Sequence, residues 1–349
     1  MSLSDAFAIQ ARACAALGSP FTARFMTLCA ERLDRRTAIG ARLHDWPGEV
    51  SNRGASVPLR LAGSLHRLVL EGAAPELAAV WPPHDPGDDA LWAAIAEALE
   101  RHRDRLDALL DCAPQTNEVR RSAVLIPVMH ALADRFGLPL TLSELGASGG
   151  LNLLADRFLL DLGGVRLGPA DATVRLTPEW RGPPPRAADL RVADRAGVDL
   201  APVDPGTAEG RLTLLSYLWP DQPERLARTD AAIALRDGPA PVAAGDAAPW
   251  LERRLAEVPG GTAHLVYHTV AWQYFPPETQ ARAAAALEAA GAAATDAAPL
   301  ARLAMETDGV QSGARLTLTV WPGGEPVTLG RADFHGRWVD WRPPDGALA

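Results

Sequence analysis

Apolar residues recur at intervals of three and four along the first 136 residues, which is the spacing of one face of an α-helix. The pattern predicts helices at 6–17, 20–33, 58–71, 89–110 and 117–136. We therefore expect residues 1–136 to form an all-helical N-terminal domain or cap.

From residue 137 the apolar positions gather into short runs bounded by glycine, proline and polar residues, as in buried strands. These runs predict strands at 138–145, 190–199, 241–246, 264–272, 300–306, 315–321, 326–331 and 338–341. Helical spacing between them predicts helices at 207–235, 247–258 and 276–290, the last one capped by Gly291. Strands that alternate with helices predict an α/β domain at 137–349, with an insertion at about 157–190.

Five small residues, Gly146 to Gly150, separate the first of these strands from a predicted helix at 151–158. Glycine lets a backbone approach a ligand closely, and a helix N-terminus offers N–H groups to an anion. The dinucleotide-binding fingerprint fails, because Ser148 and Leu151 stand where glycine is required. The alternative is a tight strand-to-helix turn without a ligand.

Composition narrows the functional classes. The net charge is −9 with no basic cluster, which disfavours nucleic acid as a partner. No apolar run reaches the ~18 residues of a membrane span, and the N-terminus does not resemble a signal peptide, so we expect a cytoplasmic protein. Cys14, Cys29 and Cys112 are few and widely spaced, as expected of reduced thiols. The oligomeric state is left open.

The chain contains no lysine, so all 34 of its basic residues are arginine. This excludes enzymes that form a Schiff base on lysine, including pyridoxal-phosphate enzymes. It also disfavours the common ATPases and kinases, which use a lysine against the phosphates.

The order Glu144, Leu145, Gly146, Ser148, Gly150 resembles the first motif of the Rossmann-like S-adenosylmethionine-dependent methyltransferases. The resemblance implies a Rossmann-like sheet of about seven strands with a terminal antiparallel hairpin. It also implies S-adenosylmethionine as cofactor, with acids after the second and third strands at the ribose and the adenine. The candidate cofactor-binding residues are Glu144, Gly146, Ala147, Ser148, Gly150, Asn152, Asp199, Asp246 and Ala247, with Asp194 as an alternative to Asp199.

Several segments also resemble the bacterial DUF2332 family. They are QTNEVRRSA (115–123), ELGASGGLNLLADRF (144–158), WPDQ (219–222) and YHTVAWQY (267–274). This resemblance extends over most of the chain and implies no established activity.

The residues after the fourth predicted strand are the candidates for catalysis. His268, Gln273 and Tyr274 are placed there, and His268 or Tyr274 would remove a proton from the acceptor. The rings of Trp272 and Tyr274 would face a cation such as a sulfonium. The alternatives are a buried core histidine and aromatic rings that only fill the core.

Three polar residues before the first strand are candidates for a lid. Asn117, Glu118 and Arg121 would close over the ligand from the helical domain, together with Trp272. Asn117 and Arg121 share one helix face. The alternative is a capped and solvated helix start.

The sequence therefore predicts a methyltransferase that acts on a small or medium-sized acceptor. The alternative from another class is a non-catalytic module of the same fold that binds another small ligand or a protein partner. In that second interpretation Glu144 caps loop amides, Asp199 is a surface turn acid and Asp246 caps the following helix.

Overall fold

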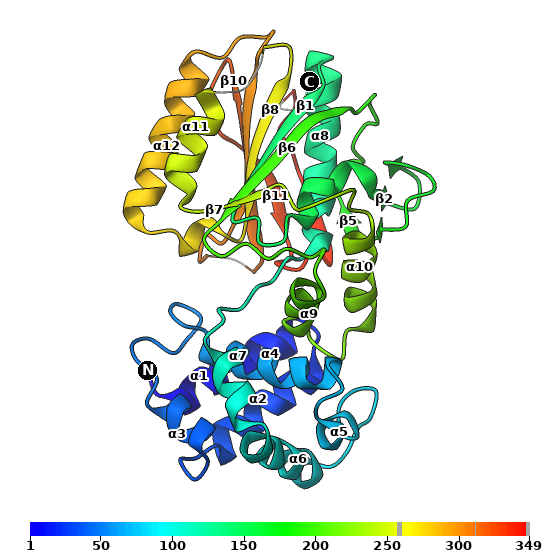
Figure 1. Ribbon diagram of the computed structural model, residues 1–349. Helices are drawn as coiled ribbons and strands as arrows, with labels where there is room; N and C mark the ends of the chain where they lie inside the picture. Colours follow the sequence, from blue (N-terminus) through cyan, green and yellow to red (C-terminus); the bar gives the residue numbers. More distant parts are fainter. Residues whose placement is uncertain (257–259, 311, 347–349) are drawn as a thin grey trace. The chain divides into compact units, whose positions relative to one another are not determined.

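The structure is a computed structural model that describes residues 1–256, 260–310 and 312–346. The chain divides into two compact units (Figure 1). Unit 1 comprises Met1–Thr116 and Thr207–Asp230, and unit 2 comprises Asn117–Gly206 and Ala231–Ala349. The sequence predicts one boundary at 136/137, whereas this division lies after Thr116 and returns the chain to unit 1 at Thr207–Asp230.

Unit 1 is helical, as its apolar spacing predicted. Its helices are α1 (Leu3–Ala16), α2 (Pro20–Arg32), α3 (Ala38–His44), α4 (Val57–Leu70), α5 (Pro75–Ala78), α6 (Asp88–Arg101), α7 (Arg103–Leu110), α9 (Ala208–Ser216) and the first part of α10 (Pro223–Ala234). Residues at helical spacing, such as Phe7 on α1, Phe25 on α2 and Leu61 and Leu65 on α4, are almost fully buried in one core. Burial of this apolar surface is the main stabilising term for the unit.

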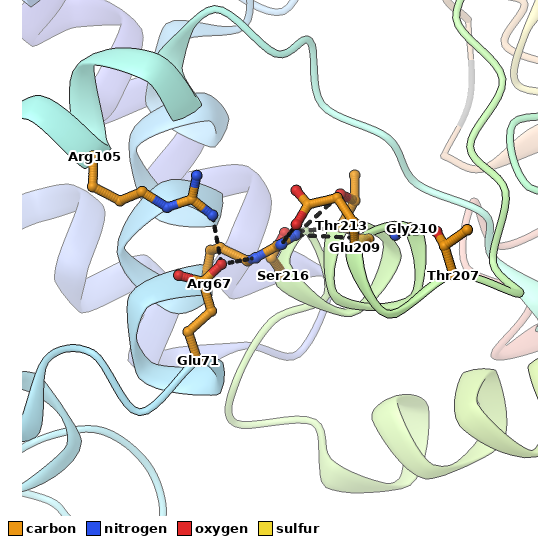
Figure 2. Close-up of polar contacts among 8 residues, drawn as sticks. All are labelled: Arg67, Glu71, Arg105, Thr207, Glu209, Gly210, Thr213 and Ser216. Atoms are coloured by element: carbon orange, nitrogen blue, oxygen red, sulfur yellow. Dashed lines mark hydrogen bonds and ion pairs between the residues drawn. The ribbon is translucent and has the colours of Figure 1, made fainter.

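A buried arginine joins α9 to α4 inside unit 1 (Figure 2). Arg67 of α4 is 1% exposed and donates to Glu71 Oε1 (2.5 Å), to Thr213 Oγ1 (3.0 Å) and to Glu209 Oε2 (2.5 Å). Arg105 donates to the same Glu71 oxygen at 2.7 Å. A buried guanidinium is tolerated only when acceptors surround it, so this arginine requires α9 at its side.

The WPDQ segment (219–222) binds the returning part of unit 1, Thr207–Asp230, to the turn between α1 and α2. Asp221 accepts hydrogen bonds from Ser19 Oγ (2.5 Å) and from the backbone N–H of Phe21 (2.9 Å), so it caps α2. The side-chain amide of Gln222 donates to the carbonyls of Leu17 and Gly18. The motif therefore has a packing role within unit 1.

Unit 2 is built on a nine-stranded, mostly parallel sheet with the order β5-β12-β11-β10-β9-β8-β1-β6-β7 (Figure 1). Its strands are β1 (Leu140–Leu145), β5 (Glu179–Arg181), β6 (Val192–Asp199), β7 (Val242–Ala244), β8 (Ala263–Thr269), β9 (Leu300–Glu306), β10 (Ala314–Trp321), β11 (Val327–Ala332) and β12 (Trp338–Trp341). The strands β7, β6, β1, β8 and β9 are parallel, whereas β10, β11 and β12 continue as an antiparallel meander.

Helices cover both faces of the parallel part. The helices α11 (Ala247–Ala256) and α12 (Pro277–Ala292) lie side by side on one face, where Leu251 and Leu287 pack against Leu145 and Val266 (Figure 1). On the other face lie α8 (Ser122–Phe136), which follows the 3₁₀ turn η1 (Val119–Arg121), and the 3₁₀ segment η2 (Leu151–Arg157). Strands covered on both faces are shielded from water along their whole length, and every residue of β1 and β8 is buried, the polar ones included.

Two details differ from the sequence predictions. The sheet has nine strands instead of about seven, because β12 extends its edge in antiparallel pairing with β11 and the three-residue β5 pairs parallel with β12. Gly291 is not a C-cap: it lies inside α12, where a Cβ atom would come within 2.6 Å of the Trp321 ring. The predicted insertion at 157–190 contains β5 and a small separate sheet of β2 (Leu159–Asp161), β3 (Arg166–Leu167) and β4 (Arg175–Leu176).

We predict that Arg67→Met lowers the free energy of unfolding by about 2–4 kcal/mol, because it leaves Glu71 and Thr213 without their buried donor. Arg105→Met is the matched control: its side chain is 44% exposed and binds the same Glu71, so we expect a loss of about 1 kcal/mol or less. Denaturation in urea measures both values. Equal losses in the two variants would contradict a special role of the buried arginine.

Candidate functional site

The direction in which strands are added to the sheet reverses between β1 and β8. The chain passes from β1 to β6 and β7 on one side, and then to β8 and β9 on the other. In open α/β sheets, ligands bind beyond the carboxyl ends of the strands at such a reversal. The candidate site therefore comprises the turns that follow β1, β6 and β8.

The turns after β1 and β8 touch each other. A Cβ atom on Gly146 would lie 2.6 Å from the Cβ atom of Ala271, and one on Gly150 would lie 2.8 Å from Cγ2 of Val242. Both glycines also have positive φ angles, of 74° and 70°. These glycines are therefore required by a tight turn and by contacts within the protein, which is the alternative that the sequence left open.

The N–H groups of Gly146, Ala147 and Ser148, in the loop after β1, are engaged within the protein. Those of Gly146 and Ala147 donate to the carbonyl of Val198 (2.9 and 3.0 Å). The N–H of Ser148 donates to Oδ2 of Asp199 at 2.8 Å. These groups are consequently not available as a cradle for phosphate oxygens.

The segment after the loop is not the α-helix that the sequence predicted. The segment η2 is a 3₁₀ helix broken at Leu154, and its first N–H, on Leu151, donates to Oδ1 of Asn117 at 2.9 Å. Leu151 to Ala155 are all buried, and Arg195 binds the carbonyl of Leu153. The contacts with Asn117 and Arg195 hold the segment in this irregular conformation, although its apolar spacing favours an α-helix. The helix N-terminus that was expected to bind an anion is therefore not formed by Leu151–Arg157.

Buried polar side chains form a hydrogen-bonded chain beside β1. Ser122 Oγ donates to Asn152 Oδ1 at 2.7 Å, and Asn152 in turn bonds the carboxyl group of Glu144. The Tyr267 hydroxyl lies 3.5 Å from Oε2 of Glu144. All four residues are at most 2% exposed.

Burial, together with the nearby charge of Asp199, raises the pKa of Glu144 to about 8, against the hydrogen bond from Asn152 and the charge of Arg121. Burial thus favours the protonated form of the Glu144 side chain. A strongly perturbed carboxyl group at a strand end is a recognised marker of a functional site.

Asp199 is the last residue of β6 and lies near the hydrogen-bonded side chains around Glu144. Its Oδ2 atom accepts from Ser148, and its Oδ1 atom accepts from the N–H of Ala201 at 3.0 Å. Asp194 lies in the first half of β6 and forms an ion pair with Arg254 of α11, so it is remote from the strand end. Of the two acids that the sequence proposed for the ribose, only Asp199 lies at the candidate site.

The acid after β7 has a structural role. Asp246 accepts from the N–H of Ala248 at 2.8 Å, and so caps α11, and it accepts from Thr279 Oγ1 of α12 at 2.7 Å. Ala247 is 6% exposed and packs in the core of this face. Both contacts match the helix-cap alternative.

His268 is buried between two charged residues of β9. Arg302 donates to its Nε2 atom at 3.0 Å and, because a guanidinium can only donate, Nε2 must accept. The proton therefore lies on Nδ1, which donates to Glu306 Oε1 at 2.8 Å. Burial lowers the pKa of His268, and its only basic lone pair is used by Arg302. In this state His268 is the buried core histidine of the second interpretation and is not poised to act as a general base.

The ring of Trp272 contacts two side chains of the protein, His268 and Arg302. The His268 ring stacks on it with centroids 4.7 Å apart, and the Arg302 guanidinium lies 4.4 Å from its centroid. The cation at this aromatic ring is thus a side chain of the protein. The neighbouring Gln273 and Tyr274 are exposed, Tyr274 by 60%.

The three predicted lid residues belong to unit 2 and not to the helical unit. Arg121 donates to the carbonyls of Thr269 (2.8 Å) and Phe334 (2.9 Å), so it holds the end of β8. Glu118 is 1% exposed and accepts from the N–H of Arg120. With Asn117 bound to Leu151, this segment ties the turns after β1 and β8 together.

Backbone strain is concentrated at the same edge of the sheet. Among the described residues, the non-glycine positions with positive φ are Ser56, Ser148 (52°) and Val270 (54°). The last two follow β1 and β8. A left-handed conformation is unfavourable for a β-branched residue, of order 1–3 kcal/mol, and such strain is typical of functional sites.

Sequence reasoning missed Glu306 and Arg302, which complete the environment of His268. The available signal was that Glu306 ends the fifth predicted strand, and the carboxyl ends of parallel strands meet at one edge. Within the described part of the chain, no cluster of three or more His, Cys, Asp or Glu residues is arranged to hold a metal ion. None of the helices described there is long and apolar enough to span a bilayer.

Comparison with known proteins gives one finding. The profile of the family DUF2332, described as "Uncharacterized protein conserved in bacteria", matches residues 4–341. No curated protein and no solved structure shows significant similarity to the chain.

We predict that Glu144→Gln flattens the pH dependence of stability. The folded state keeps a proton on Glu144 up to a pH of about 8, whereas the unfolded chain loses it near 4.5. The stability contributed by protonated Glu144 is thus complete below about pH 4.5 and is lost as the pH rises to about 8.

Free energies of unfolding measured in urea between about pH 5 and pH 8 test this prediction. The decrease over that range should be smaller in the variant, by on the order of a few kcal/mol. Glu252→Gln, which changes a carboxylate in a surface ion pair, is the control and should retain the wild-type slope. The same slope in Glu144→Gln would contradict the prediction.

Proposed function

The chain belongs to the DUF2332 family of bacterial proteins, and we propose that unit 2 binds S-adenosylmethionine beyond the carboxyl ends of β1 and β6 and transfers its methyl group to a small or medium-sized acceptor. The proposal rests on the strand reversal at β1 and on the acids that end the neighbouring strands. It extends the likeness of the Glu144–Gly150 segment to the first methyltransferase motif.

The pair of carboxyl groups, Glu144 and Asp199, is the observation that carries the proposal. Leu145 of β1 pairs with Val198 of β6, so the two acids end neighbouring parallel strands, and the charge of Asp199 raises the pKa of Glu144. Two carboxyl groups this close favour a ligand that carries hydroxyl groups and a positive charge. An adenosyl sulfonium with an amino acid tail has both.

The donor set also discriminates among adenine-containing ligands. Val198 and Asp199 engage the N–H groups of Gly146, Ala147 and Ser148, and η2 is a broken 3₁₀ helix, which disfavours a nucleotide phosphate at this loop. S-adenosylmethionine carries no phosphate. Each oxygen of Asp199 has one backbone partner and keeps a second acceptor position for a ribose hydroxyl.

When bound, the cofactor supplies an electrophilic methyl group. The residues of the chain then bind and orient: Asp199 accepts ribose hydroxyls, Glu144 faces the amino acid part, and the exposed Gln273 and Tyr274 contact the acceptor. Alignment of two bound reactants can itself contribute several kcal/mol of barrier lowering.

The second candidate is a non-catalytic module that binds a small ligand in the same place. The state of His268 favours it, because both ring nitrogens are engaged and this histidine is not ready to accept a proton. In this case a ligand binds at Asp199 and no methyl group is transferred.

We expect calorimetry to detect binding of S-adenosylmethionine and S-adenosylhomocysteine to the full chain. Asp199→Asn should weaken both by about tenfold or more, because it replaces an acceptor of hydrogen bonds from hydroxyl groups. Glu252→Gln, on the exposed side of α11, should bind as the wild type does. No binding of either compound at millimolar concentration would remove the methyltransferase proposal.

A further inference from the structure

One carboxylate oxygen at the end of β9 organises the whole turn after β8. Oε1 of Glu306 accepts three hydrogen bonds: from Nδ1 of His268 (2.8 Å), from the N–H of Ala271 (3.0 Å) and from the N–H of Trp272 (3.1 Å). Hydrogen bonds to a charged acceptor are stronger than those between neutral groups. Glu306 is thus the common anchor of a side chain and two backbone groups.

The turn that Glu306 holds is the strained one. Val270 has a φ angle of 54°, and its N–H donates to the carbonyl of Met305 at 2.8 Å, beside Glu306. The next residue, Ala271, places its methyl group where a side chain on Gly146 would have to be. A conformation unfavourable for valine persists only where surrounding contacts enforce it, and the bonds to Glu306 are such contacts.

Charge balance keeps Glu306 in its ionised form. Burial alone would raise the pKa of Glu306, but the hydrogen bond from His268 and those from the two backbone N–H groups hold the pKa below its ordinary value. Arg302, on the far side of the His268 ring, supplies a positive charge nearby. The second oxygen, Oε2, is buried and has no hydrogen-bond partner among the described residues, so the anchoring is done by Oε1.

We propose that Glu306 is a positioning residue of the strand-end site: it fixes the turn Val270–Trp272 and thereby sets the position of Ala271 over the loop after β1. The effect on ligand binding rests on the proposed function, whereas the effect on the turn does not. Glu306 acts through these groups and does not itself touch the ligand.

Hydrogen exchange of single backbone amides in the full chain, followed by NMR, tests the proposal. In Glu306→Ala the amides of Ala271 and Trp272 should exchange about tenfold faster or more, because they lose a charged acceptor. The amide of His264, at the other end of β8 and bound to the carbonyl of Pro299, should keep its rate. An equal acceleration at all three amides, or none at Ala271 and Trp272, would overturn the proposal.

Two further variants keep the test decisive if the alanine variant does not fold. Glu306→Gln retains an oxygen acceptor and should restore the protection of both amides to within about threefold of the wild type. Glu306→Asp keeps the charge but withdraws the carboxylate by one methylene, so it should loosen the same two amides selectively. Protection in the aspartate variant equal to that of the wild type would overturn the proposal.

Calorimetry with S-adenosylhomocysteine separates the two proposals. Glu306→Ala should weaken its binding about tenfold, whereas Glu252→Ala, which removes a surface ion pair with Arg282, should not. A wild-type protein that does not bind the compound would refute the proposed ligand and leave the exchange result valid. Unchanged binding in a variant whose turn is loosened would refute the positioning role.

Discussion

The close approach of two backbone turns, at Gly146 and Ala271, is the constraint on which the candidate site depends. It brings the end of β1 against the end of β8, where the strand order reverses. A side chain larger than hydrogen at Gly146 would force the turns apart, because interiors are packed to crystal-like density. Glycine at position 146 is therefore required by the packing of the two turns, whether or not a ligand binds there.

Hydrogen bonds between segments far apart in the sequence hold these turns. Asn117 and Ser122 bind the segment after β1, Arg121 binds the end of β8, and Glu306 binds the turn beyond it. These residues are largely buried, and each buried polar group needs a partner, so a change at one position disturbs several others. This explains why three of the four segments that resemble the DUF2332 family meet at one edge of the sheet, while WPDQ serves unit 1.

The spacing of apolar residues predicted many of the helices and strands, but it did not predict which of them pack or pair with one another. The strands at 300–306 and 338–341 and the helices α1, α2 and α4 follow directly from apolar spacing, whereas α3 and α5 were not predicted. The return of α9 to unit 1 depends on side chains far apart in the sequence, such as Arg67 and Asp221, and β5 is a three-residue strand whose pairing with β12 leaves no pattern in the sequence. At the candidate site, Glu144 and Asp199 could be selected from the sequence because each lies at the end of a predicted strand. The state of His268 depends on Arg302 and Glu306, which lie on another strand and are recognisable as partners only in space.

The two acids at the ends of β1 and β6, Glu144 and Asp199, differ in burial, and this difference affects how each would interact with a charged ligand. Glu144 is buried, and burial raises its pKa, whereas the half-buried carboxylate of Asp199 orders the neighbouring loop. A cation placed beside Glu144 favours its ionised form and so displaces its proton. Under the proposed function, binding of a cationic ligand would therefore be coupled to proton release, and a neutral ligand with the same hydroxyl groups would lack that coupling.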